Sequence, residues 1–309
     1  MANTVNYATI FEREINQKYA RELLTTELTS QGIRFIGGNT IKIPYVSVGG
    51  YKEHSRAGGF NRQPVANDFQ TATLAFDRDV EFFVDAMDVD ESNLALSAAN
   101  ITNVFITEQA IPETDSYRIS KLYADFVAQG GAVDGTALDA TNIIQIWDTA
   151  MQAMDDAGVP AQGRIVYVTP AVNTLFKNAF AGSRSLIAPD NGRIYRAVHN
   201  LDDVTIKMIP SVRMKTAYDF SDGWTPESGA LQINFILIHP TAVVAVDKHQ
   251  YIKLWPEGSH TAGDGYLYQN RKYGDLFLLK NKVDGVYINA EAEAEQGSGG
   301  SSGNGNSGT

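Results

Sequence analysis

Residues 40–84 read TIKIPYVSVGGYKEHSRAGGFNRQPVANDFQTATLAFDRDVEFFV, and this stretch decides how the rest of the chain can be arranged. Residues 40–48 alternate in the manner of a β-strand, and Pro44 places that strand at an edge or a bulge. Residues 49–63 are polar and rich in glycine, as expected of a hairpin tip. Residues 68–84 alternate again, which predicts one long returning strand.

The length of this hairpin is its most informative property. The returning strand alone would extend about 55 Å at about 3.3 Å per residue, whereas a compact chain of this size has a radius of gyration of about 19 Å. A two-stranded hairpin is barely stable by itself, and long irregular tips are uncommon inside compact domains. We therefore expect an arm that projects from the body and rests on a neighbouring chain. The alternative is a hairpin folded back within a larger sheet of its own chain.

The flanking segments predict an α+β fold. Apolar residues at helical spacing between Ile10 and Leu28 predict an amphipathic N-terminal helix. Ser92 is expected to cap a helix that Pro112 interrupts or restarts, and a second helix should end at Gly130. Thr141 is expected to cap a third helix. The other predicted elements are a strand at 164–168 leading into a helix after Thr169 and Pro170, and strands at 204–208, 233–238, 251–255 and 265–279.

The composition excludes several classes of protein. The chain has 309 residues, 43% of them hydrophobic, enough for one large or two medium domains. The absence of cysteine excludes disulfides and thiolate chemistry and fits synthesis in a reducing cytoplasm. A net charge of -11 argues against a protein that grips nucleic acid, because clustered Lys and Arg dominate such binding. We see no secretion signal and no apolar segment long enough to cross a membrane.

Motifs that carry chemistry are weak, so we expect no catalytic residue, no metal site and no cofactor. A G-x-S-x-G match at 299–303 lies in a Gly/Ser tract that offers no strand-to-helix turn. Asp88 and Asp90 open like a calcium loop, but Asn93 and Ala99 stand where glycine and a bidentate carboxylate are needed. Acidic residues ahead of a helix start explain that cluster better. Residues 291–309 should be flexible, and could serve as an attachment point for decoration, a surface filler or a cloning remnant.

Four ordered blocks resemble the major capsid proteins of tailed phages that infect Gram-positive bacteria. They are GNTIKIPYVSVGGYKEHSR (38–56), RDVEFFVDAMDVDES (78–92), EQAIPETDSYRISKLYADF (108–126) and YQNRKYGDLFLLKNKVDGVYIN (268–289). The resemblance covers nearly all of residues 1–290 and implies the Hong Kong ninety-seven type of shell fold. It divides the chain into an N-terminal arm (1–31), an extended E-loop (32–85), a peripheral domain with a spine helix (86–140 and 247–272), an axial domain (141–246 and 273–290) and a flexible tail (291–309).

The resemblance also implies how the chain works. Identical subunits would form pentamers and hexamers of an icosahedral or prolate capsid, enclosing double-stranded DNA without sequence-specific binding. A portal would be a further partner. Because no long acidic segment precedes the arm, a separate scaffolding protein, or a scaffold removed earlier, is also implied. The shell would assemble in the host cytoplasm, and we assign no cross-linking partner to Lys42 or Lys52. The expected subunit interface comprises Tyr45, Tyr51, Phe60, Arg62, Phe69, Leu74, Phe76, Arg118 and Tyr123.

Two other functions stay open at this point. The first is an encapsulin-like cage of the same fold that houses protein cargo instead of a genome. The second is a monomeric hydrolase that uses paired carboxylates, with Asp77, Asp79 and Glu81 as candidates on one strand face. Solvent-exposed alternation along a strand explains those three acids more simply.

Overall fold

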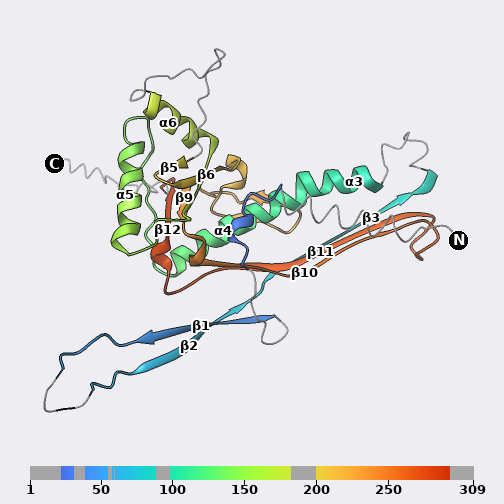
Figure 1. Ribbon diagram of the computed structural model, residues 1–309. Helices are drawn as coiled ribbons and strands as arrows, with labels where there is room; N and C mark the ends of the chain where they lie inside the picture. Colours follow the sequence, from blue (N-terminus) through green and yellow to red (C-terminus); the bar gives the residue numbers. More distant parts are fainter. Residues whose placement is uncertain are drawn as a thin grey trace, which may run out of the picture.

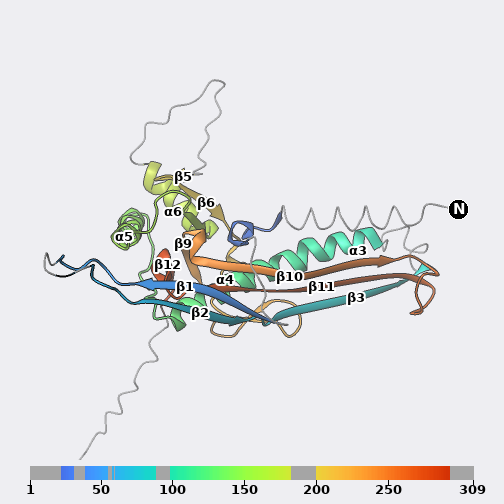
Figure 2. The ribbon, with the colours of Figure 1, turned by 60° about the horizontal axis from the view of Figure 1, so that its bottom comes forward.

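The computed structural model describes residues 22–30, 39–54, 58, 60–87, 98–181 and 200–292. The predicted N-terminal helix around Ile10, the Ser92 cap and the tail beyond residue 292 lie outside these ranges. A lobe of helices and sheet lies at one end of the molecule (Figure 1). A long helix and three long strands run away from this lobe, and a two-stranded hairpin points in the opposite direction (Figures 1 and 2).

The lobe is built on a five-stranded sheet with the order β12-β9-β4-β6-β5. Its strands are β4 (Ile165–Val168), β5 (Asn200–Leu201), β6 (Val204–Met208), β9 (Ile233–Ile238) and β12 (Val286–Ala290). Strands β4 and β6 are parallel, and the other neighbours are antiparallel. Both faces of β4 and β9 are covered, which explains their continuous apolar sequences.

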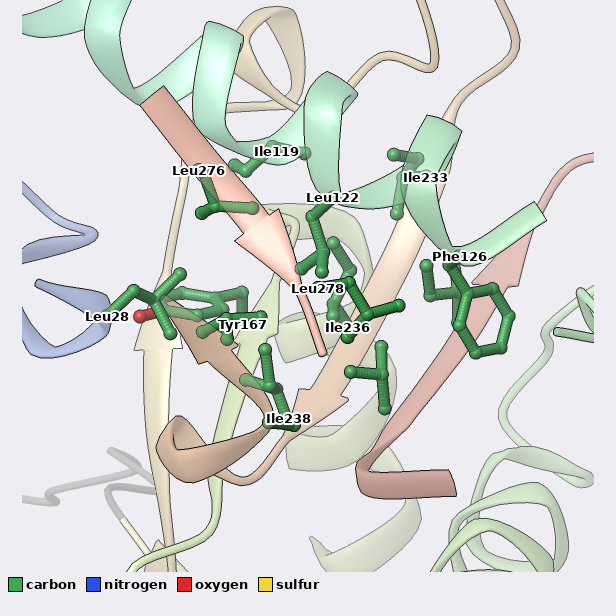
Figure 3. Close-up of a cluster of buried hydrophobic side chains, with 14 of the residues drawn as sticks. Leu28, Ile119, Leu122, Phe126, Tyr167, Ile233, Ile236, Ile238, Leu276 and Leu278 are labelled. Carbon is green, nitrogen blue, oxygen red and sulfur yellow. The ribbon is translucent and has the colours of Figure 1, made fainter. Parts of the chain in front are cut away.

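Alternation along β4 and β9 divides their side chains between two cores. Val166 and Phe235 point toward α5 (Ile143–Asp156) and α6 (Pro170–Ala181), where Trp147 is fully buried. Tyr167 and Ile236 point the other way, into the cluster shown in Figure 3. That second cluster joins the lobe to the long helix and to the ends of the long strands, so the two parts of the molecule share one core.

The long helix consists of α3 (Ala98–Phe105), a π-helical turn η2 (Ile106–Ala110) and α4 (Ile111–Ala128). The predicted restart at Pro112 is confirmed, because the α-helix is interrupted by the π-helical turn and α4 begins again with Pro112 in its first turn. Proline removes one N–H donor, and the widened turn, in which the N–H of Ile111 donates to the carbonyl of Ile106, stands just before it. The predicted end at Gly130 is confirmed, since that residue has φ +83°.

The start of α5 differs from the prediction. Thr141 does not cap this helix: its N-cap residue is Asn142, and no side chain caps it. The carboxylate of Asp139 instead orders the preceding turn, accepting the backbone N–H groups of Thr141 (2.7 Å) and Asn142 (2.9 Å). At α6 the predicted cap is confirmed, because Thr169 Oγ1 accepts the N–H of Val172 and Pro170 begins the helix.

The long strands form an antiparallel sheet with the order β10-β11-β3, made by β10 (Val243–Trp255), β11 (Gly265–Leu278) and β3 (Phe76–Asp85). The single returning strand expected for 68–84 is therefore wrong. Strand β2 (Val65–Thr73) pairs with β1 (Thr40–Val48), whereas β3 pairs with β11. Burial alternates without a break through Leu74 and Ala75, which separate the two strands, so periodicity alone does not reveal the change of partner.

Short strands and turns complete the described fold. Strands β7 (Tyr218–Asp219) and β8 (Thr225–Pro226) form a small hairpin, and η1 (Thr26–Leu28), η3 (Ser211–Arg213), η4 (Pro240–Ala242) and η5 (Val283–Gly285) are single turns. Among the described residues, no helix is both long enough and apolar enough to span a bilayer.

Asp134 closes the outer edge of the five-stranded sheet. Its backbone bonds to Ile288 and Ala290, and its carboxylate accepts from the Tyr287 hydroxyl and the Asn289 amide, each at 2.9 Å. Burial acts to raise the pKa of Asp134, but these hydrogen bonds together with those from Thr136 outweigh it, and the pKa lies below its usual value.

We predict that Asp134→Asn lowers the stability of the chain at neutral pH and loses this effect in acid. The native carboxylate has a depressed pKa, so its contribution is present above the unfolded-state pKa of about 3.9 and is lost as pH falls through the folded-state value. Thermal unfolding of both proteins across pH measures the difference. A gap that persists unchanged in acid would contradict the assignment.

Candidate subunit interface

The β1–β2 hairpin forms a sheet by itself within the described part of the chain. Its register is unbroken, from Thr40 opposite Thr73 to Val48 opposite Val65. Figures 1 and 2 both show it pointing away from β3, toward the end of the molecule at which the lobe lies. A ribbon of two strands covers neither of its faces, and isolated hairpins are marginally stable in water. Most of this element therefore lacks cover from its own chain.

Exposed apolar side chains concentrate on this hairpin. Tyr51 is 109% and Phe60 is 95% exposed, relative to a free side chain. Val48, Val65 and Phe69 are exposed as well. Apolar surface gathered on one projecting element is typical of a protein–protein contact. Sequence reasoning found the aromatic members and missed the two valines, which strand alternation alone does not mark as uncovered.

The charge of the hairpin differs from that of the chain. Lys42, Lys52 and Arg62 are exposed on it, against one described exposed acid, Glu53. The whole chain carries a net charge of -11. A locally basic arm on an acidic subunit is suited to contact a second copy of the same chain.

The base of the hairpin is fixed to the body. Ile41 and Leu74 are buried against Val246 of β10 and Phe277 of β11. At the junction with β3, the carboxylate of Asp275 accepts the N–H of Ala75 at 2.8 Å. The hairpin thus leaves the body from a firm attachment.

Phe76 lies within a set of stacked rings at the same junction. It stacks on Tyr117 of α4 with ring centroids 4.0 Å apart, and Phe220 meets it edge-on at 6.2 Å. The Tyr117 hydroxyl donates to Asp275 at 2.8 Å. Burial raises the pKa of both groups, and the pair keeps this junction closed. Leu74 and Phe76, expected on a partner, are thus occupied by intrachain contacts.

Arg118 is likewise used inside the chain. Residues 22–30 pass over α4, where the fully buried Asp115 accepts from the N–H (3.1 Å) and the hydroxyl (2.9 Å) of Thr25. Arg118 donates to the carbonyl of Thr25 at 3.0 Å and pairs with Asp247 of β10 at 3.2 Å. Burial raises the pKa of Asp115 despite these hydrogen bonds. The network ties the segment that follows the predicted arm helix to the long helix and to β10.

The nine predicted interface residues therefore separate into groups. Tyr51, Phe60, Arg62 and Phe69 share the exposed hairpin. Tyr123 is partly buried against the main core, and Leu74, Phe76 and Arg118 are buried. Tyr45 lies in β1 opposite Asp68, and its side chain is outside the described set. The buried network around Asp115 was missed, although its spacing of four residues from both Ile111 and Ile119 places it on the buried face.

The three acids considered for a hydrolase lie on the open face of the β10-β11-β3 sheet. Asp77 receives two hydrogen bonds from Arg271, at 2.9 and 2.6 Å, which hold its pKa below the usual value. Glu81 accepts from Gln269 at 2.7 Å. A carboxylic acid that donates a proton to a leaving group needs a raised pKa, so Asp77 is suited to an ion pair. Among the described residues, no cluster of three or more His, Asp or Glu side chains is placed to hold a metal ion.

A cleft of about 470 Å³ lies on the other face of this sheet, beside the π-helical turn. Arg78 and Glu113 line it and form an ion pair of 2.6 Å. Burial raises the pKa of Glu113, against the opposing effect of Arg78. Arg78 and Glu113 therefore neutralise each other within this cleft.

The comparisons with solved structures identify the fold. Mycobacterium phage Che8 aligns with a TM-score of 0.57 at 17% identity, covering 82% of this chain and 85% of that one. The capsid structure of cyanophage P-SCSP1u aligns at 0.61 and 14% identity, covering 86% and 87%. The mature capsid of bacteriophage PhiM1 aligns at 0.61 and 16% identity, covering 83% of each chain.

The chain has the tailed-phage capsid fold. Its α+β class and the resemblance of its four sequence blocks are confirmed at the level of fold. No protein-family model matches the chain, and no curated protein matches it. Strands β1 and β2 lie within the range expected for the E-loop, 32–85, and α4 lies within the range 86–140 that was expected to hold the spine helix.

We predict that substitutions of two phenylalanines, Phe76 at the base of the hairpin and Phe60 at its tip, change the stability of the protomer to different extents. Phe76→Ala should lower the free energy of unfolding of the protomer by about 3 kcal/mol, because it empties a buried ring stack. Phe60→Ser should change it by less than about 0.5 kcal/mol, because that ring is exposed. Denaturant unfolding of unassembled protomers measures both, and equal losses would contradict the placement of Phe60.

Proposed function

We propose that this chain is a structural, non-enzymatic shell subunit that assembles with copies of itself into a phage capsid around double-stranded DNA. The observation that carries the proposal is the uncovered hairpin with its exposed Tyr51 and Phe60. The capsid fold of the neighbours supports it. On this proposal the virion capsid is where the protein acts.

Each subunit would lay its hairpin over the next, while the lobes close into rings of five or six through head-to-tail contacts. Interfaces of permanent assemblies commonly bury more than about 2,000 Å². Because every subunit gives one arm and receives another, contacts that are modest singly hold the shell collectively. A portal and a separate scaffolding protein are partners that we propose from the sequence resemblance alone.

The domain boundaries in this proposal follow the sequence expectation with one change. The expected E-loop, 32–85, included residues that belong to β3, which pairs with β11 in the long sheet. We place the end of the projecting part at Leu74 and Ala75. Residues 86–140 and 247–272 would remain the peripheral domain, and 141–246 with 273–290 the axial domain.

The negative net charge of the chain suits a capsid wall that does not bind the enclosed DNA tightly. Phosphate neutralisation by Lys and Arg dominates protein–DNA affinity, and a net charge of -11 opposes it. The DNA would be enclosed without base-specific contacts.

We predict that replacing residues 49–63 with a short Gly-Ser turn abolishes assembly while the protomer stays folded. The replacement removes Tyr51 and Phe60. Both side chains are exposed, so the folding of the body does not depend on them. Size-exclusion chromatography with light scattering measures the mass, and circular dichroism the fold. The control is the double variant Glu53→Gln/Gln63→Glu, which keeps the length, the charge and the aromatic rings. Particles of normal mass from the shortened chain would contradict the arm mechanism.

The second candidate is a cage for protein cargo. A virus-like particle from Pyrococcus furiosus aligns with a TM-score of 0.50 at 12% identity, covering 92% of this chain and 99% of that one. Electron microscopy of native particles, combined with assays of their nucleic acid and protein content, separates the two functions. Particles filled with DNA support the capsid, and particles that hold a co-purifying protein and no DNA support the cage.

A further inference from the structure

Gln70 connects the hairpin to the body at some distance from its base. It lies in β2, opposite Ile43, and its side chain is half-buried. The amide nitrogen donates to the carbonyl of Leu278 at 3.0 Å, and the amide oxygen accepts the N–H of Lys280 at 3.0 Å. Both hydrogen-bonding groups of one side chain are thus engaged with backbone that lies more than 200 residues away in sequence.

Two hydrogen bonds from one planar amide fix the direction of the Gln70 side chain, which a single hydrogen bond would leave free to rotate. The backbone at Leu278 is itself held in place by the long helix. The carbonyl of Leu278 also accepts from Gln129, at the end of the long helix, at 3.1 Å, and the N–H of Leu278 donates to Asp125 of the same helix at 3.4 Å. Gln70 therefore orients the hairpin relative to the long helix.

The position of Gln70 along the hairpin gives it leverage. The junction at Leu74 and Ala75, where the chain changes sheets, is the natural pivot. Gln70 lies about 13 Å from this pivot and Val65, at the far end of the strand, about 30 Å, taking about 3.3 Å per residue. A rotation that moves Gln70 by a given amount therefore moves the far end of the strand about twice as far.

We propose that Gln70 is a positioning residue that sets the angle between the hairpin and the body, and so the place where the tip meets a second copy of the chain. The role in assembly rests on the proposed shell function; the effect on the angle does not. Apolar packing of Ile41 and Leu74 holds the base, and the amide clamp selects one direction among those the base permits.

The test measures the angle directly. The chain has no cysteine, so Lys52→Cys on the tip and Gln152→Cys on α5, both exposed, provide a unique pair for spin labels. Labelled protomers are diluted with unlabelled protein, and pulsed electron resonance gives the distance distribution. Gln70→Met keeps the side-chain length and removes both hydrogen bonds. Gln70→Glu keeps the acceptor for Lys280 and loses the donor to Leu278. Thr71→Val, an exposed position on the same strand, is the control.

We expect a narrow distribution for the parent and for Thr71→Val, and a broader, shifted one for both Gln70 variants, with unchanged circular dichroism. Unchanged distributions in the Gln70 variants overturn the inference, even if particles form. Where the parent assembles, the Gln70 variants should give particles of altered or mixed diameter in electron micrographs. A parent that stays monomeric under all conditions overturns the shell function and leaves the result on the angle standing.

Discussion

A ribbon of two β-strands has two faces and two edges, and among the residues of β1–β2 whose burial is described, the buried ones, Ile41 and Ala72, lie at its base. The rest of the described molecule supplies a support from which the ribbon projects. The support is made by the long sheet, the long helix and the core that joins them to the lobe. An element that cannot bury its own apolar side chains and is nevertheless held firmly at one end is organised to meet another molecule.

The long helix α4 connects several parts of the described structure. Its apolar stripe, which includes Ile119, Leu122 and Phe126, packs into the main core. Its polar groups bind the N-terminal segment through Asp115 and the hairpin junction through Tyr117. A buried polar group that loses its hydrogen-bond partner costs free energy, so these bonds favour the arrangement in which both partners are present. Here the apolar contacts stabilise the fold, and the polar contacts fix where residues 22–30 and the hairpin attach to the body.

Periodicity predicted the strands and the ends of several helices because burial repeats with the geometry of the backbone. The alternation of β3 and the end of α4 at Gly130 are examples. It could not predict that residues 65–85 form two strands in different sheets, because the inward and outward sides stay the same across Leu74. The sequence also led us to expect Phe76 and Arg118 at a subunit interface. The identity of an aromatic or charged residue does not reveal whether its own chain or a partner buries it. Gln70 could not be found at all, because its partners are backbone groups brought together only by the fold.

The attachment of the hairpin has a consequence for the order of events during synthesis. Residues 40–75 leave the ribosome before the groups that hold them, Val246, Asp275 and Phe277, are made. Contacts between segments so far apart in sequence form late in folding, because closing the long intervening loop costs conformational entropy. A nascent subunit therefore cannot present its arm in the final direction until its own body is complete. On the proposed shell function, a partly synthesised chain therefore cannot engage a second copy in register, and this timing follows from the topology itself.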